Sequence, residues 1–323
     1  MPRGRARLSD IEFFERTLGF SVEHGTMLKE IHPECVDKYQ DHSLFKLLCI
    51  NYWIGFFLPI THKNLREKKG LKIAYVDPMA GSGVTISSRE GDCFCGSSPS
   101  ALLSAKRNPF DIIITNDIDK QKVDVLQERL ESIVDSDPTA LLHYNDDIIN
   151  VSYEIAEQIG KKTISYVVID PEALRGLKWK AIKPLLCCSG DAMITFFSLE
   201  LWRLKQAATS DVKTPQTASQ FERINELMGN CGWEHTKNQE DLISLFAQRI
   251  IDECGKKGFQ KIKIPRQGGD FYMLLFVGND KTIEKAKEWK KNIERRMKSR
   301  IGNELSILLD IKAKRRTSLD QFQ

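Results

Sequence analysis

The segment that most constrains the fold of this chain covers residues 72–85. Residues 73–76 are apolar at every position without alternation, which is typical of a strand buried on both faces of a sheet. The run stops at Asp77 and Pro78 and passes through Ala80 into Gly81-Ser-Gly83. The two glycines allow backbone conformations that other residues rarely adopt, and they let a ligand approach the main chain. We therefore predict a buried strand that carries a cofactor-binding loop.

The glycine loop lacks the marks of the two common phosphate-binding loops. A dinucleotide fingerprint needs glycine or alanine three residues after the second glycine, where this chain has Ile86. A P-loop needs Gly-Lys-Ser/Thr, which does not occur. A carboxylate, Asp77, stands beside the loop instead, and this favours a cationic nucleotide without phosphates. Both observations disfavour another kind of nucleotide-dependent enzyme on the same sheet.

Three further strand-like runs, residues 110–115, 141–143 and 164–169, also end in acids. The residues that follow them are Asp117, Ile118 and Asp119, then Asp146 and Asp147, then Asp170, Pro171 and Glu172. Parallel strands point their carboxyl ends at one crevice, so we expect the acids after the four strands to converge there.

Two of these positions have expected roles in binding a nucleoside. Asp117 offers two adjacent acceptors to the two hydroxyls of a ribose. Asp146, with Asp147 beside it, is a candidate to bind the amino group of adenine. Asp119 is expected to cap the next helix, and Ile118 is placed with the binding residues.

Composition narrows the class of protein. Of 323 residues, 41% are hydrophobic and 28% charged, as in a globular protein with a sizeable core. The net charge of +4 is compatible with a nucleic-acid partner without indicating one. The eight cysteines include no Cys-x-x-Cys pair, so we expect no metal site and a reducing, cytoplasmic compartment. Residues 44–60 are apolar but contain Lys46, which predicts a buried helix and no membrane span.

We expect five segments along the chain. Residues 1–70 are helices packed on the sheet, 71–206 the cofactor-binding core, and 207–258 a helical insert that forms a lid or substrate wall. Residues 259–300 form a hairpin and a basic helix that complete the core, and 301–323 form a basic tail. Within the core, residues 86–100 are expected to form a loop over the cofactor mouth.

The motifs resemble those of the three-Cys-motif partner proteins, a family of methyltransferase-like proteins of prokaryotes. The matching segments are residues 42–60, 75–83, 96–99, 117–119, 169–171 and 271–276. Residues 77–83 are also similar to the first motif of class I S-adenosylmethionine-dependent methyltransferases. The resemblance implies an α/β fold with a Rossmann-like, mostly parallel sheet whose last strand is antiparallel. It also implies S-adenosylmethionine as the cofactor, bound by Asp77, Pro78, Ala80, Gly81, Gly83, Asp117, Ile118, Asp146 and Asp147.

The resemblance places the reaction centre at Asp170, Pro171 and Glu172. Methyl transfer from a sulfonium depends on in-line geometry more than on an acid or base. Amino methyltransferases with Asp-Pro-Pro-Tyr at this place bind the amine with the acid and stack the base on the aromatic ring. This chain has Glu172 and Ala173 in the last two positions, and Glu172 is either a hydrogen-bond acceptor or an acid at a helix N-terminus. A stacking ring would have to come from Trp179, Phe197 or Trp202, which core packing explains equally.

The implied function is an S-adenosylmethionine-dependent methyltransferase acting on nucleic acid or on a protein partner. The alternative is a non-catalytic, methyltransferase-like binding protein that acts with a partner. Basic tracts at residues 3–7, 281–300 and 312–316 are candidates to contact phosphates, although a solvated helix face and frayed ends are the favoured explanation. Residues 316–322 are similar to peptides that bind sliding clamps. No membrane association is expected.

Overall fold

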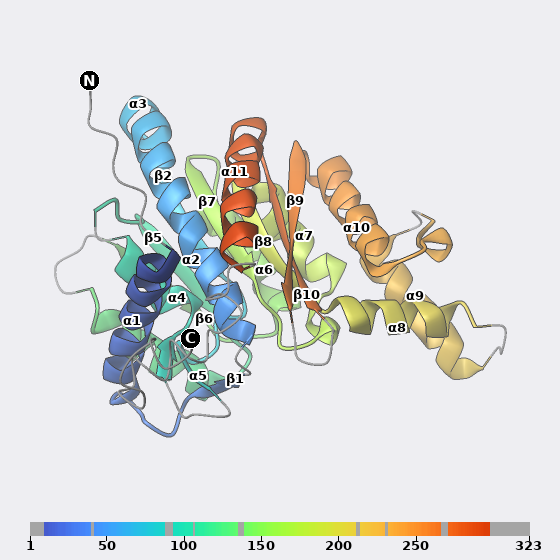
Figure 1. The fold of residues 1–323 in the computed structure, drawn as a ribbon, viewed down its shortest axis with the longest axis horizontal. Helices are drawn as coiled ribbons and strands as arrows, with labels where there is room; N and C mark the ends of the chain where they lie inside the picture. Colours follow the sequence, from blue (N-terminus) through green and yellow to red (C-terminus); the bar gives the residue numbers. More distant parts are fainter. Residues whose placement is uncertain are drawn as a thin grey trace, which may run out of the picture.

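The computed structural model describes most of the chain (Figure 1). The described residues are 10–39, 42–87, 93–105, 107–134, 139–210, 214–229, 232–265 and 271–297. The basic tracts at 3–7 and 312–316 and the tail at 316–322 lie outside them. No helix in these ranges combines the length and the apolar character that crossing a bilayer requires.

A seven-stranded sheet forms the centre of the molecule. Its strands lie in the order β6 (Ala140–Tyr144), β5 (Ile112–Asn116), β2 (Lys72–Asp77), β7 (Thr163–Ile169), β8 (Asp191–Phe196), β10 (Phe271–Gly278) and β9 (Gly258–Pro265). The first five strands are parallel, and β10 runs antiparallel to both neighbours. The predicted mostly parallel sheet with an antiparallel last strand is confirmed. Strand order reverses between β2 and β7, which is where sheets of this kind bind ligands.

Helices bury both faces of the sheet at its centre, where strands β2, β7 and β8 are buried at nearly every position. On one face, Trp53 of α2 (His42–Thr61) and Trp289 of α11 (Asp280–Met297) pack against Phe276 of β10. On the other face, Phe246 of α10 (Gln239–Cys254) packs edge-on against Phe196 of β8, with ring centroids 4.7 Å apart. Both faces of the central strands are therefore part of the hydrophobic core.

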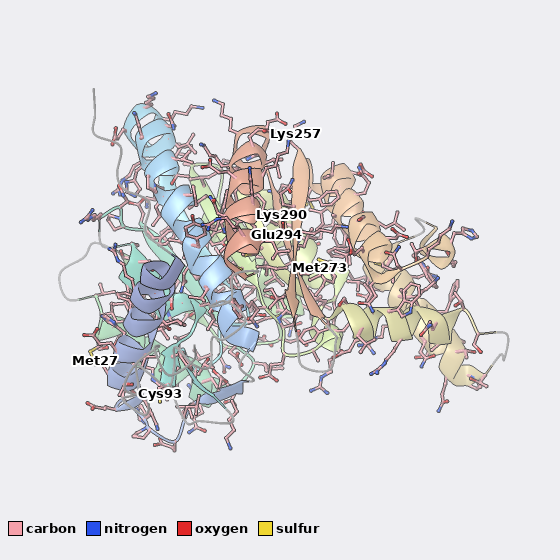
Figure 2. All side chains as sticks on the ribbon, in the orientation of Figure 1. Met27, Cys93, Lys257, Met273, Lys290 and Glu294 are labelled. Carbon is pink, nitrogen blue, oxygen red and sulfur yellow. The ribbon has the colours of Figure 1, made fainter. Side chains whose placement is uncertain are left out.

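The remaining helices connect the strands and complete these two layers. They are α4 (Ser97–Ser104), α5 (Lys120–Glu131), α6 (Ile148–Ile159), η2 (Leu174–Gly176), α7 (Trp179–Cys188), α8 (Ser198–Ala208), α9 (Pro215–Met228) and η3 (Trp233–His235), with η1 (His62–Arg66) and α3 (Glu67–Lys69) extending α2. Helices α9 and α10 form most of the expected insert at 207–258, and together with α8 they lie toward the β10 and β9 end of the sheet, far from β6 (Figure 1). On α11, lysines form ion pairs with glutamates of the same helix, as Lys290 does with Glu294 at 3.6 Å (Figure 2).

A second, smaller sheet stands where a loop was expected. Strand β1 (Asp37–Tyr39) pairs with β3 (Val84–Ser87), and β3 pairs with β4 (Cys93–Cys95). Helix α1 (Asp10–Lys29) lies on β4, and Gly25 permits this because a Cβ there would come within 2.5 Å of the Phe94 backbone. The expectation of a loop over residues 86–100 is therefore wrong: its described parts are strands and the start of α4.

A buried arginine ties this N-terminal part to the core. Arg129 of α5 is 0% exposed, and its guanidinium donates hydrogen bonds to the carbonyls of Leu28, Ile31, His32 and Cys35, at the end of α1 and just after it. It also donates to the carbonyl of Ser82 in the glycine loop, at 2.8 Å. Unpaired carbonyls at a helix end need donors, and one side chain supplies several here. The N-terminal segment and the glycine loop therefore share a support.

Candidate active site

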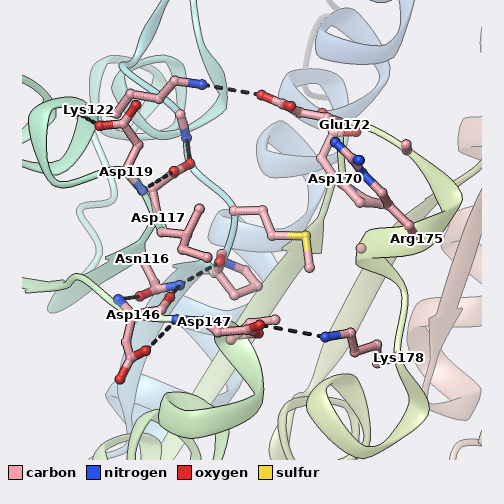
Figure 3. A pocket seen from close by; sticks show the side chains of 18 of the residues that line it. Asn116, Asp117, Asp119, Lys122, Asp146, Asp147, Asp170, Glu172, Arg175 and Lys178 are labelled. Atoms are coloured by element: carbon pink, nitrogen blue, oxygen red, sulfur yellow. Dashed lines mark hydrogen bonds and ion pairs between the residues drawn. The ribbon is translucent and has the colours of Figure 1, made fainter.

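A cavity of about 480 Å³ opens at the carboxyl ends of β2, β5, β6 and β7 (Figure 3). Seven carboxylates and three cations are among the described residues that line it. The carboxylates are Asp37, Asp117, Asp119, Asp146, Asp147, Asp170 and Glu172, and the cations are Lys122, Arg175 and Lys178. The excess of negative charge makes the cavity suited to a cationic ligand.

Most of the predicted site residues line this cavity. Those that do are Pro78, Gly81, Asp117, Ile118, Asp146, Asp147, Asp170, Pro171 and Glu172. Three others, Asp77, Ala80 and Gly83, belong to the same loop but do not line it. Acids separated by many residues therefore share one edge of the sheet, as the strand-end pattern indicated.

The glycine loop is shaped by two left-handed residues. Gly81 has φ +62° and Gly83 has φ +81°, conformations that side chains disfavour. A Cβ on Gly81 would lie 2.5 Å from Oδ2 of Asp37, and one on Gly83 would lie 2.5 Å from Leu126. The Gly81 nitrogen donates to Asp117 at 3.0 Å. The loop is therefore clamped from several sides and needs glycine at both positions.

Asp77 is buried beneath the loop and does not line the cavity. Its carboxylate accepts hydrogen bonds from the hydroxyls of Ser97 and Ser98 at the start of α4, and from the backbone nitrogen of Met79. Burial raises the pKa of Asp77 to about 6, while the Ser97 hydrogen bond opposes the rise. In this structure Asp77 joins the glycine loop to α4.

Asp37 enters the site from β1 and was not anticipated from the sequence. One of its oxygens accepts hydrogen bonds from the nitrogen and the hydroxyl of Ser82, at 2.7 and 2.9 Å. The other lies 2.8 Å from Nζ of Lys122. No local pattern marks this aspartate, because its partners lie far along the chain.

Lys122 crosses the mouth of the cavity. In addition to Asp37, its Nζ contacts Glu172 at 3.2 Å, so it links β1, α5 and the segment after β7 (Figure 3). Burial lowers the pKa of Lys122, but the hydrogen bond and charge of Asp37 outweigh it and hold the pKa above its usual range. Glu172 precedes a 3-10 turn and α7 begins only at Trp179, so Glu172 is not a helix N-terminal acid. Asp119 caps α5 through Gln121 and Lys122, as predicted.

An asparagine joins the loops after β2, β5 and β6. The amide nitrogen of Asn116 donates to the carbonyls of Pro78 and Asp146, at 3.0 and 3.1 Å. Asp147 caps α6 and lies 3.6 Å from Lys178 on the opposite wall. Burial raises the pKa of Asp117, while hydrogen bonds from the Asp119 and Gly81 nitrogens and the charge of Lys122 oppose the rise.

Asp170 is held by a buried lysine. Nζ of Lys46, on α2, lies 2.7 Å from one of its oxygens and 2.8 Å from the other. Lys46 is 4% exposed and Asp170 9%. The only signal in the sequence was a lysine within an otherwise apolar helix. Such a residue needs an anionic partner, but the sequence does not identify it.

Other expected contributions to the site are absent among the described residues. Neither the described part of residues 86–100 nor that of the insert at 207–258 lines the cavity, so the expected covering loop and the expected lid or substrate wall are not found there. Trp179, Phe197 and Trp202 do not line it either. The described ranges contain no group of three His, Cys, Asp or Glu residues arranged to hold a metal ion.

The order of the seven strands, with the antiparallel strand near one edge, is that of class I methyltransferases. Similar solved structures include Trm1 from Pyrococcus horikoshii with S-adenosyl-L-methionine, at 10% identity and TM-score 0.40, covering 76% of this chain and 58% of that one. A second is M. capricolum TrmK with S-adenosyl-homocysteine, at 10% identity and TM-score 0.34, covering 70% of this chain and 68% of that one. A third is M. jannaschii TYW2 with AdoMet, at 9% identity and TM-score 0.33, covering 68% of this chain and 74% of that one. Because these identities and TM-scores are low, the fold class rests on the strand order. No family model and no curated protein matches the chain.

Proposed function

We propose that this chain is an S-adenosylmethionine-dependent methyltransferase that acts on nucleic acid or on a protein partner at Asp170, Pro171 and Glu172. The observation that carries the proposal is the acid-rich cavity at the switch point of the sheet. Seven carboxylates against three cations repel the phosphates of NAD or ATP and attract a sulfonium and an ammonium group.

The helix that follows the glycine loop supports the same choice. In dinucleotide-binding sheets the N-terminus of this helix faces the pyrophosphate. Here β3 and β4 separate the loop from α4, and the first residues of α4, Ser97 and Ser98, bond to the buried Asp77. An anion of the protein itself already uses this end of the helix.

The lining residues fit the parts of an adenosyl group. Ile118 is 71% exposed, and a large apolar side chain at this level of exposure inside a cavity offers a surface for a ring such as adenine. Asp117 has acceptor capacity left for ribose hydroxyls, since each of its oxygens accepts one backbone hydrogen bond. Asp146 lines the cavity at the end of the adjacent strand, where it would bind the amino group of the same ring.

S-adenosylmethionine would supply an electrophilic methyl group, and the residues of this chain would orient its acceptor. The segment from Pro171 to Lys178 forms the wall opposite the acids after β5 and β6. Asp170, just before this segment, and Glu172 within it would be hydrogen-bond acceptors for an attacking group. The resemblance to the three-Cys-motif partner proteins, the cytoplasmic compartment, and a clamp-binding tail remain predictions.

A second candidate is a methyltransferase-like protein that binds the cofactor without transferring the methyl group. Two observations favour it. The position of the stacking aromatic holds Ala173, and among the described residues none of the three alternative aromatics lines the cavity. In addition, Asp170 is already engaged by Lys46.

Calorimetry with S-adenosylmethionine and S-adenosylhomocysteine tests the proposal, together with the melting temperature in the presence of each. We expect binding of both and a rise in melting temperature with ligand concentration. Heat from neither ligand and an unchanged melting temperature would reject both candidates. Binding without transfer of labelled methyl groups to RNA, DNA or lysate proteins would favour the second.

A further inference from the structure

The Lys46–Asp170 ion pair lies behind the wall where the cavity meets β7. The ammonium of Lys46 contacts both oxygens of Asp170, at 2.7 and 2.8 Å, and both residues are at least nine-tenths buried. A carboxylate has about four acceptor positions, so Asp170 keeps acceptor capacity toward the cavity that it lines. Because the lysine is so close, the cavity faces a carboxylate whose charge is largely compensated.

Asp170 lies toward the end of the cavity where a sulfonium would bind. The strands run β6, β5, β2, β7, and Asp146 and Asp117 follow the first two. If those two acids hold a nucleoside, the group attached to its ribose would lie nearer to the glycine loop of β2 and to Asp170 after β7. Adjacent strands lie ~4.8 Å apart, so this loop and Asp170 are neighbours.

We propose that Lys46 is a positioning residue that sets the relative affinity of this site for S-adenosylmethionine and S-adenosylhomocysteine, and this rests on the proposed function. The two ligands differ by one methyl group and by the positive charge of the sulfonium. A compensated Asp170 discriminates weakly between them, so the demethylated product binds nearly as well as the donor. An uncompensated Asp170 attracts the positive charge of the sulfonium, which only S-adenosylmethionine carries.

The test is calorimetry of both ligands on the full chain at pH 8. We expect Lys46→Met to raise the ratio of S-adenosylmethionine affinity to S-adenosylhomocysteine affinity at least fivefold. Asp170→Asn, which removes the negative charge that the lysine contacts, should lower the ratio at least fivefold, and Lys46→Arg should keep it. The matched control is Lys205→Met, which removes another buried lysine, one that donates to the Thr236 carbonyl outside the cavity.

Equal changes in the two affinities for Lys46→Met and Asp170→Asn would overturn the inference and leave the proposed function standing. Absence of binding of either ligand to the unaltered chain would instead reject the proposed function. Removing one partner of a buried pair is destabilising, so Lys46→Met can fail to fold. In that case Asp170→Asn is compared with the double variant Lys46→Met/Asp170→Asn. Removal of the lysine charge must then raise the ratio, and an unchanged ratio overturns the inference.

Discussion

Asp37 and Ser82 lie 45 residues apart, yet one oxygen of Asp37 accepts hydrogen bonds from both the nitrogen and the hydroxyl of Ser82. This contact joins the N-terminal segment directly to the glycine loop. The glycine loop is therefore held by a part of the chain that precedes the sheet.

Replacement of Asp37 by alanine should loosen this loop. Hydrogen bonds to a charged group contribute ~1.5–3 kcal/mol, and Lys122 also loses its closest partner. We expect a free energy of unfolding lower by about 2–3 kcal/mol in urea denaturation. Affinity for S-adenosylhomocysteine should fall about tenfold in calorimetry. The neighbouring Lys38 is exposed, and Lys38→Ala should change neither quantity. Equal effects of the two substitutions would contradict the role of Asp37.

Gly81→Ala should lower the free energy of unfolding by more than the backbone conformation of Gly81 explains. Alanine at positive φ costs ~1 kcal/mol or more, and the new Cβ would also meet Asp37 at 2.5 Å. Gly70 has nearly the same φ, +63°, but nothing within 4 Å of a Cβ, so Gly70→Ala pays the conformational cost alone. We expect Gly81→Ala to lower the free energy of unfolding by about 1–2 kcal/mol more than Gly70→Ala does. If the two variants lose similar amounts of unfolding free energy, the Asp37 side chain moves aside for the new Cβ without an energetic cost.

Ile118→Ser should weaken cofactor binding without affecting stability. The side chain is 71% exposed and lines the cavity, so its removal costs little in the free protein. Loss of its apolar contact with a bound ring corresponds to ~1–2 kcal/mol, or about tenfold in affinity. Tyr153→Ser is the matched control, because Tyr153 is 67% exposed on α6 and does not line the cavity. A fall in melting temperature for Ile118→Ser, or unchanged affinity, would count against this role.

Asp77 should make the protein less stable as pH rises from about 4 to 6. Burial raises the pKa of Asp77 to about 6 in the folded chain, against ~3.9 in the unfolded chain. The folded state therefore binds more protons in this window, and the free energy of unfolding falls as pH rises through it. Two pKa units correspond to about 3 kcal/mol, and above pH 6 this contribution is constant.

Urea unfolding at pH 4, 5, 6 and 7 checks this dependence, with Asp77→Asn expected to lose the decline between pH 4 and 6. Asp191→Asn is a useful comparison. Burial raises the pKa of Asp191 to about 7. The fall in the free energy of unfolding that Asp191 causes should therefore continue to about pH 7. Parallel curves for the unaltered chain and Asp77→Asn would show that Asp77 does not titrate in this window.

Local pattern determined the central sheet and the acids at its edge. Strands such as 73–76 and 164–169 are recognisable because burial on both faces demands an unbroken apolar run. Once the strands are parallel, their carboxyl ends must share an edge, so the convergence of Asp117, Asp146 and Asp170 followed from the sequence. The glycine turn could also be predicted from the sequence, because a positive φ is favoured by glycine at single positions.

Only the tertiary structure decided which groups face the cavity and which support it. Asp77 has the motif position of a ligand-binding acid but lies buried against Ser97 and Ser98, because a strand pair between the loop and α4 brings those hydroxyls over it. Asp37 and Lys46 contact the site from segments 45 and 124 residues away from their partners. Such contacts depend on how helices and sheets pack, and side-chain pairing between distant segments leaves no periodic trace in a sequence.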